Sequence, residues 1–272
     1  RSAADLEIPM VGICLCYSSG YFYQLFNEHG EQKEKEMNWS FFYEFDRVEK
    51  PITIKIQDKT IKVSAWLYRV IGQSGHVIPI YLLTTDVEGN EGWQKKLTAA
   101  LYDSTSRWHR IVQELILGVG GVRLLKSLGY ENLEVYHINE GHGSFATLEL
   151  LKNFDNDIEK VKEKVVFTTH TPVPAGHDTF NYDLVKDVFR ERLPNNIKDL
   201  GGEKELNMTV LALNLSRYCN GVARKHGEIS QEMFPNYDID SITNGIHLPF
   251  WVSKPMRRIF DKKWPNWKSK PY

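Results

Sequence analysis

The feature that most constrains this chain is a strand, a polar loop and a helix that occur in this order twice in the middle of the sequence. The apolar runs 133–138 and 164–169 have the length of buried strands, and the polar loops 139–144 and 170–178 follow them. Such alternation is typical of a doubly wound parallel α/β sheet. Because these sheets bind ligands at the carboxyl ends of their strands, we expect the two loops to carry the functional groups.

Three regions before this repeat complete the expected sheet. The apolar run 8–15 predicts a strand that is buried on both faces. Apolar and polar side chains alternate over 53–66 around a polar turn at 58–59, which predicts a β-hairpin inserted beside the main sheet. The run 77–83 is again typical of a buried strand, although Pro79 favours a place at the edge of the sheet.

A long helix is predicted over 106–129, where apolar residues recur at helical spacing and a glycine stands at the C-terminal cap. Gly118, Gly120 and Gly121 lie inside this pattern. The glycines of a phosphate-binding loop would instead lie between a strand and the start of a helix. We therefore interpret the three glycines as points where the helix packs closely against a sheet.

The composition disfavours several classes of function. With 34 Lys and Arg against 35 Asp and Glu, the net charge of −1 offers no basic surface for nucleic acid. The longest apolar stretch, 115–122, is too short and too rich in glycine to span a membrane. The odd number of cysteines, Cys14, Cys16 and Cys219, indicates reduced thiols and a cytoplasmic location.

Four of the nine histidines lie in or beside the two polar loops, namely His137, His142, His170 and His177. They fit a metal site completed by Glu140 or Asp178, although no recognised ligand spacing places them on one centre. They also fit a structural role, in which each imidazole bonds to loop carbonyls. In the third interpretation, Asn, Glu and His side chains bind the hydroxyl groups of a sugar. These residues alone leave the three interpretations open.

Segments 137–146, 168–178, 220–229 and 242–247 carry the most distinctive motifs of the chain, among them HINEGHG and NGVARKH. All four resemble the α-glucan phosphorylase family, which includes the glycogen, starch and maltodextrin phosphorylases, and they resemble most its shorter bacterial and archaeal branch. Gln113 and Glu114 and the glycines that follow them match the family as well. The resemblance runs through the whole chain in the family's order.

The resemblance implies a fold and a domain organisation. The fold is an α/β, Rossmann-like doubly wound sheet that forms one half of a GT-B glycosyltransferase. Residues 1–272 are then a single N-terminal-type domain that is truncated at its start, since residues 1–6 read like the middle of a helix. The second, cofactor-binding domain is expected to lie outside this chain.

The implied reaction is the phosphorolysis of terminal α-1,4-linked glucose to glucose 1-phosphate, with retained configuration. The implied partners are an α-glucan or maltodextrin and inorganic phosphate, and the full-length protein is expected to form a homodimer. Pyridoxal 5'-phosphate is the family's cofactor, and its Schiff-base lysine is expected outside this chain. We therefore expect the segment alone to be inactive.

By resemblance, His226 has the catalytic role. Its ring binds the glucosyl 6-hydroxyl, and its backbone carbonyl faces the anomeric carbon, where a fixed dipole stabilises the positive charge of the transition state. The resemblance implies substrate-binding roles for seven further residues, Asn139, Glu140, His142, His170, Asp178, Glu228 and Asn244.

Two other functions remain open at this point. A nucleotide-sugar-dependent glycosyltransferase can share the GT-B architecture, since a fold alone does not determine its function. A non-catalytic glucan-binding module would use the same sugar-binding residues without the reaction.

Overall fold

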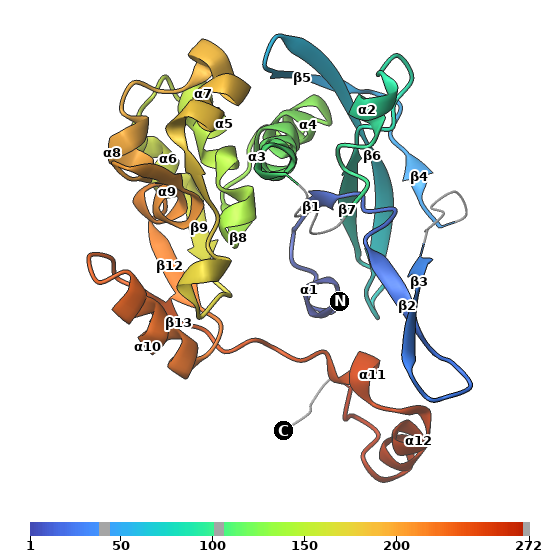
Figure 1. Ribbon diagram of the computed structural model, residues 1–272. Helices are drawn as coiled ribbons and strands as arrows, with labels where there is room; N and C mark the ends of the chain where they lie inside the picture. Colours follow the sequence, from blue (N-terminus) through green and yellow to red (C-terminus); the bar gives the residue numbers. More distant parts are fainter. Residues whose placement is uncertain (38–43, 101–105, 269–272) are drawn as a thin grey trace.

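The computed structural model describes residues 1–37, 44–100 and 106–268. Two main sheets form the framework, and a segmented helix lies between them (Figure 1). The first sheet has five strands in the order β1-β7-β6-β4, with β5 paired to β6. Its strands are β1 (Gly12–Leu15), β4 (Asp46–Arg47), β5 (Ile52–Ile56), β6 (Lys59–Ile71) and β7 (Val77–Thr84).

The predicted hairpin is present as β5 and β6, but its turn is formed by Gln57 and Asp58 rather than by 58–59. Gln57 adopts a positive φ of 53° there. The hairpin is not inserted beside the main sheet, as the alternation suggested. Strand β6 runs for 13 residues and pairs with β7 along its second part, so the hairpin is continuous with the sheet.

The strand β7 lies between β1 and β6, so the edge position expected from its proline is wrong. Pro79 is opposite Arg69 of β6, whereas the pairing with β1 begins one residue later, with Gly12 opposite Ile80. No residue of β1 therefore needs the N–H that proline lacks. The run 8–15 is only partly a buried strand, because it enters the sheet at Gly12 and Ile8 is 41% exposed.

The second sheet has four parallel strands in the order β13-β12-β9-β8. They are β8 (Tyr136–Asn139), β9 (Val165–Thr168), β12 (Tyr218–Gly221) and β13 (Asp240–Ser241). The prediction of an α/β fold with parallel strands is confirmed. Its parallel pairs are divided between two sheets, because in the described part of the chain β1 pairs with β7 alone and β8 with β9 alone.

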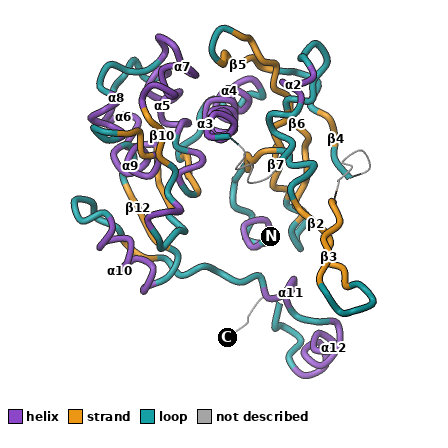
Figure 2. Tube along the Cα trace, in the orientation of Figure 1, coloured by secondary structure: helices purple, strands orange, loops and turns teal. Residues whose placement is uncertain are grey.

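Helices surround the second sheet, whereas the first consists largely of strands (Figure 2). The helices that follow the strands of the second sheet are α5 (Phe145–Asn153), α6 (Ile158–Lys164), α7 (Tyr182–Phe189), α8 (Ile197–Gly201), α9 (Met208–Asn214) and α10 (Arg224–Met233). The short strands β10 (Thr179–Asn181) and β11 (Glu205–Asn207) pair beside them.

The predicted long helix consists of α3 (Arg107–Leu115), a π-helical turn (Ile116–Gly120) and α4 (Gly121–Ser127). A Cβ atom on Gly118 would lie 2.5 Å from the backbone nitrogen of Ala146 in α5. On Gly120 it would lie 2.9 Å from a methyl carbon of Ile54 in β5. Close packing against a sheet is therefore confirmed for Gly120, and for Gly121, which faces Ile13 of β1, whereas Gly118 packs against the helix α5.

The remaining elements lie at the periphery. They are α1 (Ser2–Asp5), the exposed hairpin of β2 (Tyr21–Phe26) and β3 (Gln32–Met37), α2 (Gly92–Lys95), α11 (Leu248–Trp251) and α12 (Lys254–Lys263). No helix in the described ranges has the length and apolar character needed to cross a bilayer. All three cysteines are free thiols, and burial raises the pKa of Cys14 to about 11.

Candidate functional site

Four loops leave the carboxyl ends of the parallel strands β8, β9, β12 and β13, all at one edge of the second sheet. Backbone hydrogen bonds join neighbouring loops there. Thr169 N–H donates to the carbonyl of Asn220 over 3.0 Å, and Asn244 N–H donates to the carbonyl of Val222 over 3.0 Å. The four distinctive segments of the sequence therefore meet at this edge.

Glu140 connects the first two loops. One carboxylate oxygen accepts from the backbone N–H of Gly141 at 3.1 Å, and the other accepts from His170 N–H at 2.7 Å and from Thr171 Oγ1 at 2.9 Å. The residue is 8% exposed and has φ 64° and ψ 168°, a conformation that costs of order 1–3 kcal/mol outside glycine. Its carboxylate is thus occupied in holding the β8 and β9 loops together.

Two of the four loop histidines, His137 and His177, bond to neighbouring threonine residues. His177 is 9% exposed, and its ring nitrogens lie 2.8 Å from Thr209 Oγ1 and 3.1 Å from the carbonyl of Thr171. His137 Nε2 lies 2.8 Å from Thr168 Oγ1, and burial lowers the pKa of this imidazole. The structural interpretation therefore applies to His177, which bonds to a loop carbonyl, whereas His137 is partly exposed and bonds to a hydroxyl group.

Three predicted residues present exposed polar side chains at the edge of the sheet. Asn139 is the last residue of β8, His170 follows β9, and Asn244 follows β13. The backbone of each loop is held by the hydrogen bonds described above. Donors and acceptors of this kind on fixed backbone suit the recognition of hydroxyl groups.

His226 lies in the first turn of α10, and its ring packs against the end of β12. Its Nδ1 lies 3.4 Å from the backbone nitrogen of Val222, while the buried Nε2 has no hydrogen-bond partner. A Cβ atom on Gly221 would lie 2.5 Å from Nδ1, so glycine is needed at that position. The carbonyl of an α-helical residue points along the helix axis to the N–H four residues later. The backbone carbonyl of His226 is therefore directed along α10, and it is not available to face a bound sugar as the resemblance implied.

Glu228 lies one half-turn further along α10. It is exposed, and its carboxylate lies 3.0 Å from Lys225 Nζ. The structure thus places it on the solvent side of the helix, in an ion pair with its neighbour.

A group of charged side chains lies behind the β8 and β9 loops, and we call it the Arg110 cluster. It consists of Arg107, Arg110, Glu114, His142 and Asp178.

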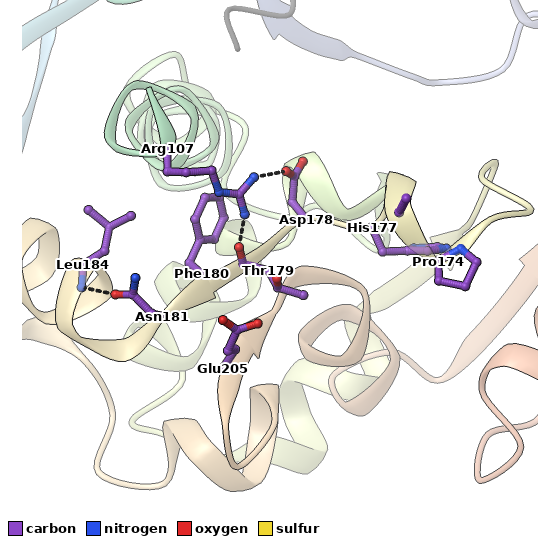
Figure 3. A pocket seen from close by; sticks show the side chains of 10 residues that line it. Arg107, Pro174, His177, Asp178, Thr179, Phe180, Asn181, Leu184 and Glu205 are labelled. Carbon is purple, nitrogen blue, oxygen red and sulfur yellow. Dashed lines mark hydrogen bonds and ion pairs between the residues drawn. The ribbon is translucent and has the colours of Figure 1, made fainter. Parts of the chain in front are cut away.

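Arg110 is the centre of this cluster. Its Nη2 lies 2.8 Å from Asp178 Oδ2 and 2.7 Å from His142 Nδ1, and its Nε lies 3.1 Å from Glu114 Oε1. Arg107 also binds Asp178, at 3.1 Å, and approaches the carbonyl of Thr179 (Figure 3). Glu114, His142 and Asp178 are close enough together to hold a metal ion. The guanidinium of Arg110 takes the place of a cation among them.

The electrostatics of the cluster depend on burial and on shared hydrogen bonds. Burial raises the pKa of Glu114 to about 7. Burial opposes ionisation of Asp178 as well, but hydrogen bonds from His142 and Arg110 hold the pKa of its carboxyl below the usual range. Burial likewise opposes the charged form of His142, yet the carboxylates of Asp178 and Glu114, 3.6 and 3.8 Å from Nδ1, raise its pKa to about 9.

A surface pocket of about 470 Å³ opens beside Asp178, within the size range of small-molecule sites (Figure 3). Arg107 and Asp178 belong to both the pocket and the Arg110 cluster. The pocket is lined by Arg107, Pro174, Ala175, His177, Asp178, Thr179, Phe180, Asn181, Leu184 and Glu205.

Known proteins resemble this chain in sequence over nearly all of its length, although no protein-family model matches it. Maltodextrin phosphorylase of Thermococcus litoralis is 33% identical over 96% of the chain and 34% of its own length. Glycogen phosphorylase of Mycobacterium tuberculosis is 32% identical over 93% of the chain and 34% of its own length. That of Aquifex aeolicus is 29% identical over 96% and 41%. The chain is homologous to the α-glucan phosphorylases.

The resemblance inferred from the sequence motifs is thereby confirmed, and the chain spans little more than a third of the length of these phosphorylases. Three members of the Arg110 cluster were not predicted as site residues of this phosphorylase homologue, namely Arg107, Arg110 and Glu114. The signal was available, because the spacing of Arg107, Arg110 and Glu114 places them on one face of a helix.

Pyridoxal phosphate needs a lysine for its Schiff base and cationic groups for its phosphate. Lys225 is on the exposed side of α10 and pairs with Glu228, while Arg107 and Arg110 are bound to Asp178. These residues of the phosphorylase homologue do not fit the cofactor, and we derive no step of a reaction through it.

Proposed function

We propose that this chain supplies the sugar-binding side of an α-glucan phosphorylase, which releases glucose 1-phosphate from the end of an α-1,4-glucan with inorganic phosphate. In this proposal residues 1–272 form one N-terminal-type, Rossmann-like domain of a GT-B enzyme that acts as a homodimer. The observation that supports it best is that four segments far apart in the sequence meet at one sheet edge. The names of the phosphorylase relatives support the same reaction.

We assign the recognition of the glucan to the exposed edge. Asn139, His170 and Asn244 bind sugar hydroxyls there, and Glu140 keeps the His170 loop in place through its backbone N–H. His142 and Asp178 act from the Arg110 cluster, which lies behind these loops.

His226 contributes through its ring in this proposal. A buried polar atom without a partner costs about 1–3 kcal/mol, and a movement of the surrounding side chains that admitted a glucosyl hydroxyl to Nε2 would recover this energy. A contact that strengthens as charge develops on the sugar lowers the barrier rather than only improving substrate binding.

The test is to express the complete reading frame that contains this chain and to incubate the protein with maltodextrin and phosphate. Phosphate-dependent release of glucose 1-phosphate is the expected result, and the purified 272-residue chain alone should release none. Activity that requires a nucleotide sugar would favour the glycosyltransferase, and glucan binding without reaction would favour the binding module. In the active protein, His226→Ala should lower kcat more than it raises KM, and an unchanged kcat would remove His226 from the catalytic role.

A further inference from the structure

The Arg110 cluster joins three elements that are far apart in the sequence. Helix α3 supplies Arg110 and Glu114, the turn after β8 supplies His142, and the loop before β10 supplies Asp178. The guanidinium of Arg110 approaches all three partners within 3.1 Å. One side chain therefore determines how two loops of the proposed sugar site lie on α3.

Glu114 lies closer to Arg110 Nε, at 3.1 Å, than to the His142 loop, where Nδ1 is 3.8 Å from its Oε1. Its side chain is 2% exposed, and neither carboxylate oxygen accepts a hydrogen bond. A buried carboxylate is costly unless a cation compensates it, and Arg110 Nε at 3.1 Å is that cation. The charge of Glu114 therefore acts on the loops through Arg110.

Arg110 and a protonated His142 compete for the same carboxylates. Arg110 Nη2, at 2.7 Å, can donate to His142 Nδ1 only while that nitrogen carries no proton. Once protonated, the imidazole would donate instead, and the acceptors nearest to Nδ1 are Asp178 Oδ2 at 3.6 Å and Glu114 Oε1 at 3.8 Å. Because the pKa of His142 is raised to about 9, its imidazole is protonated from pH 6 to pH 8, and the ionisation of Glu114 decides how Arg110 and His142 share the carboxylates.

We propose that Glu114 is a positioning residue, which through Arg110 holds the His142 and Asp178 loops in the arrangement that binds glucan and releases them when it is protonated. This inference rests on the proposed function, because it takes the two loops to be part of the sugar site. The charged and titratable groups that face the cluster are Arg107 and Arg110 on α3, His142, Asp178, and Tyr17, which follows β1.

The change falls in a physiological range of pH. Since burial raises the pKa of Glu114 to about 7, its charge is lost between pH 8 and pH 6. When a residue acts on a ligand site through its neighbours, its removal changes the affinity for the ligand by several-fold to roughly tenfold.

The experiment measures the affinity of the full-length protein for maltoheptaose from pH 6 to pH 8, in the wild type and three variants. The wild type should bind about tenfold more weakly at pH 6 than at pH 8. Glu114→Gln should bind weakly at both values, and Glu114→Asp should restore the pH dependence. Glu149→Gln is the matched control, since it removes a buried Arg–Glu pair that does not touch the loops, and it should behave as the wild type.

An affinity of Glu114→Gln that equals the wild type across this range would overturn the inference. If that variant does not fold, hydrogen–deuterium exchange of the wild type decides, after correction for the intrinsic effect of pH. The segments 140–146 and 170–180 should lose protection at pH 6, and equal protection at both values would overturn the inference. Wild-type protein that binds no glucan at any pH would overturn the proposed function, whereas the exchange result would still report on Glu114.

Discussion

Two arginine–glutamate pairs on either side of the π-helical turn differ in how fully their hydrogen bonds are used. Arg123 of α4 binds Glu149 of α5 through both carboxylate oxygens, at 2.7 and 2.8 Å, and donates to the carbonyl of Thr53 at 3.0 Å. Arg110 of α3 lies beside Glu114, but its hydrogen bonds go to Asp178 and His142. The first pair is a complete bidentate bond, whereas the second leaves a buried carboxylate without a hydrogen bond.

We interpret the Arg123–Glu149 pair as a structural contact and the Arg110–Glu114 pair as a functional one, although both arginines belong to the helix that the π-helical turn divides. A satisfied pair between α4 and α5 has one stable arrangement. A guanidinium shared among three acceptors has more than one possible arrangement. A buried group whose pKa is perturbed is also a common property of functional sites. The π-helical turn between the two pairs is also of a kind that is frequent at such sites.

The largest expected effect is the loss of unfolding free energy when Arg110 or Arg123 is replaced by methionine. Arg110→Met leaves the carboxylate of Glu114 buried without its cation, and leaves Asp178 with Arg107 as its arginine partner, which costs about 3–5 kcal/mol of unfolding free energy. Arg123→Met should cost less, about 1–3 kcal/mol, because only one carboxylate loses its donors and the arginine of this pair is itself 31% exposed. Urea unfolding at pH 8 measures both values. A larger loss for Arg123→Met would invalidate the distinction between the two pairs.

A smaller effect is expected in the pH dependence of stability. Burial raises the pKa of Glu114 from 4.5 to about 7, so the folded protein binds this proton more tightly than the unfolded chain does. The resulting stabilisation is complete below pH 4.5 and disappears as the pH rises through 7. Between pH 5 and pH 8 the wild type should therefore lose on the order of 2 kcal/mol relative to Glu114→Gln. A difference between the two proteins that does not change with pH would show that Glu114 is ionised throughout.

Local patterns in the sequence predicted much of the fold. The strands β8 and β9, the glycines of the long helix and the chain's relationship to the phosphorylases all follow from short segments. The full length of β6 was not predicted. The second part of this strand pairs with β7, and those residues lie outside the alternating pattern of the hairpin.

The candidate site was predicted less completely, for a related reason. Asn139 and His170 were expected at this edge because they follow predicted parallel strands, whereas Asn244 was identified only by the resemblance to the phosphorylases. Glu140 was expected to bind sugar, and only the folded chain shows its carboxylate between two loops. The Arg110 cluster depends on three elements that meet in space, and spacing along the sequence cannot reveal such a meeting.

The smallest effect on stability is expected at Glu228. Its ion pair with Lys225 is the third pair in this comparison and lies largely in solvent. Lys225 and Glu228 are 77% and 52% exposed, so Glu228→Gln and Lys225→Met should leave the unfolding free energy unchanged within error. If Glu228 binds sugar as predicted, Glu228→Gln alone should weaken the affinity for maltoheptaose, because Lys225→Met keeps the carboxylate. Equal affinities in the two variants and the wild type would remove Glu228 from the site, and would leave ligand binding to the loops that Glu140 and Arg110 hold together.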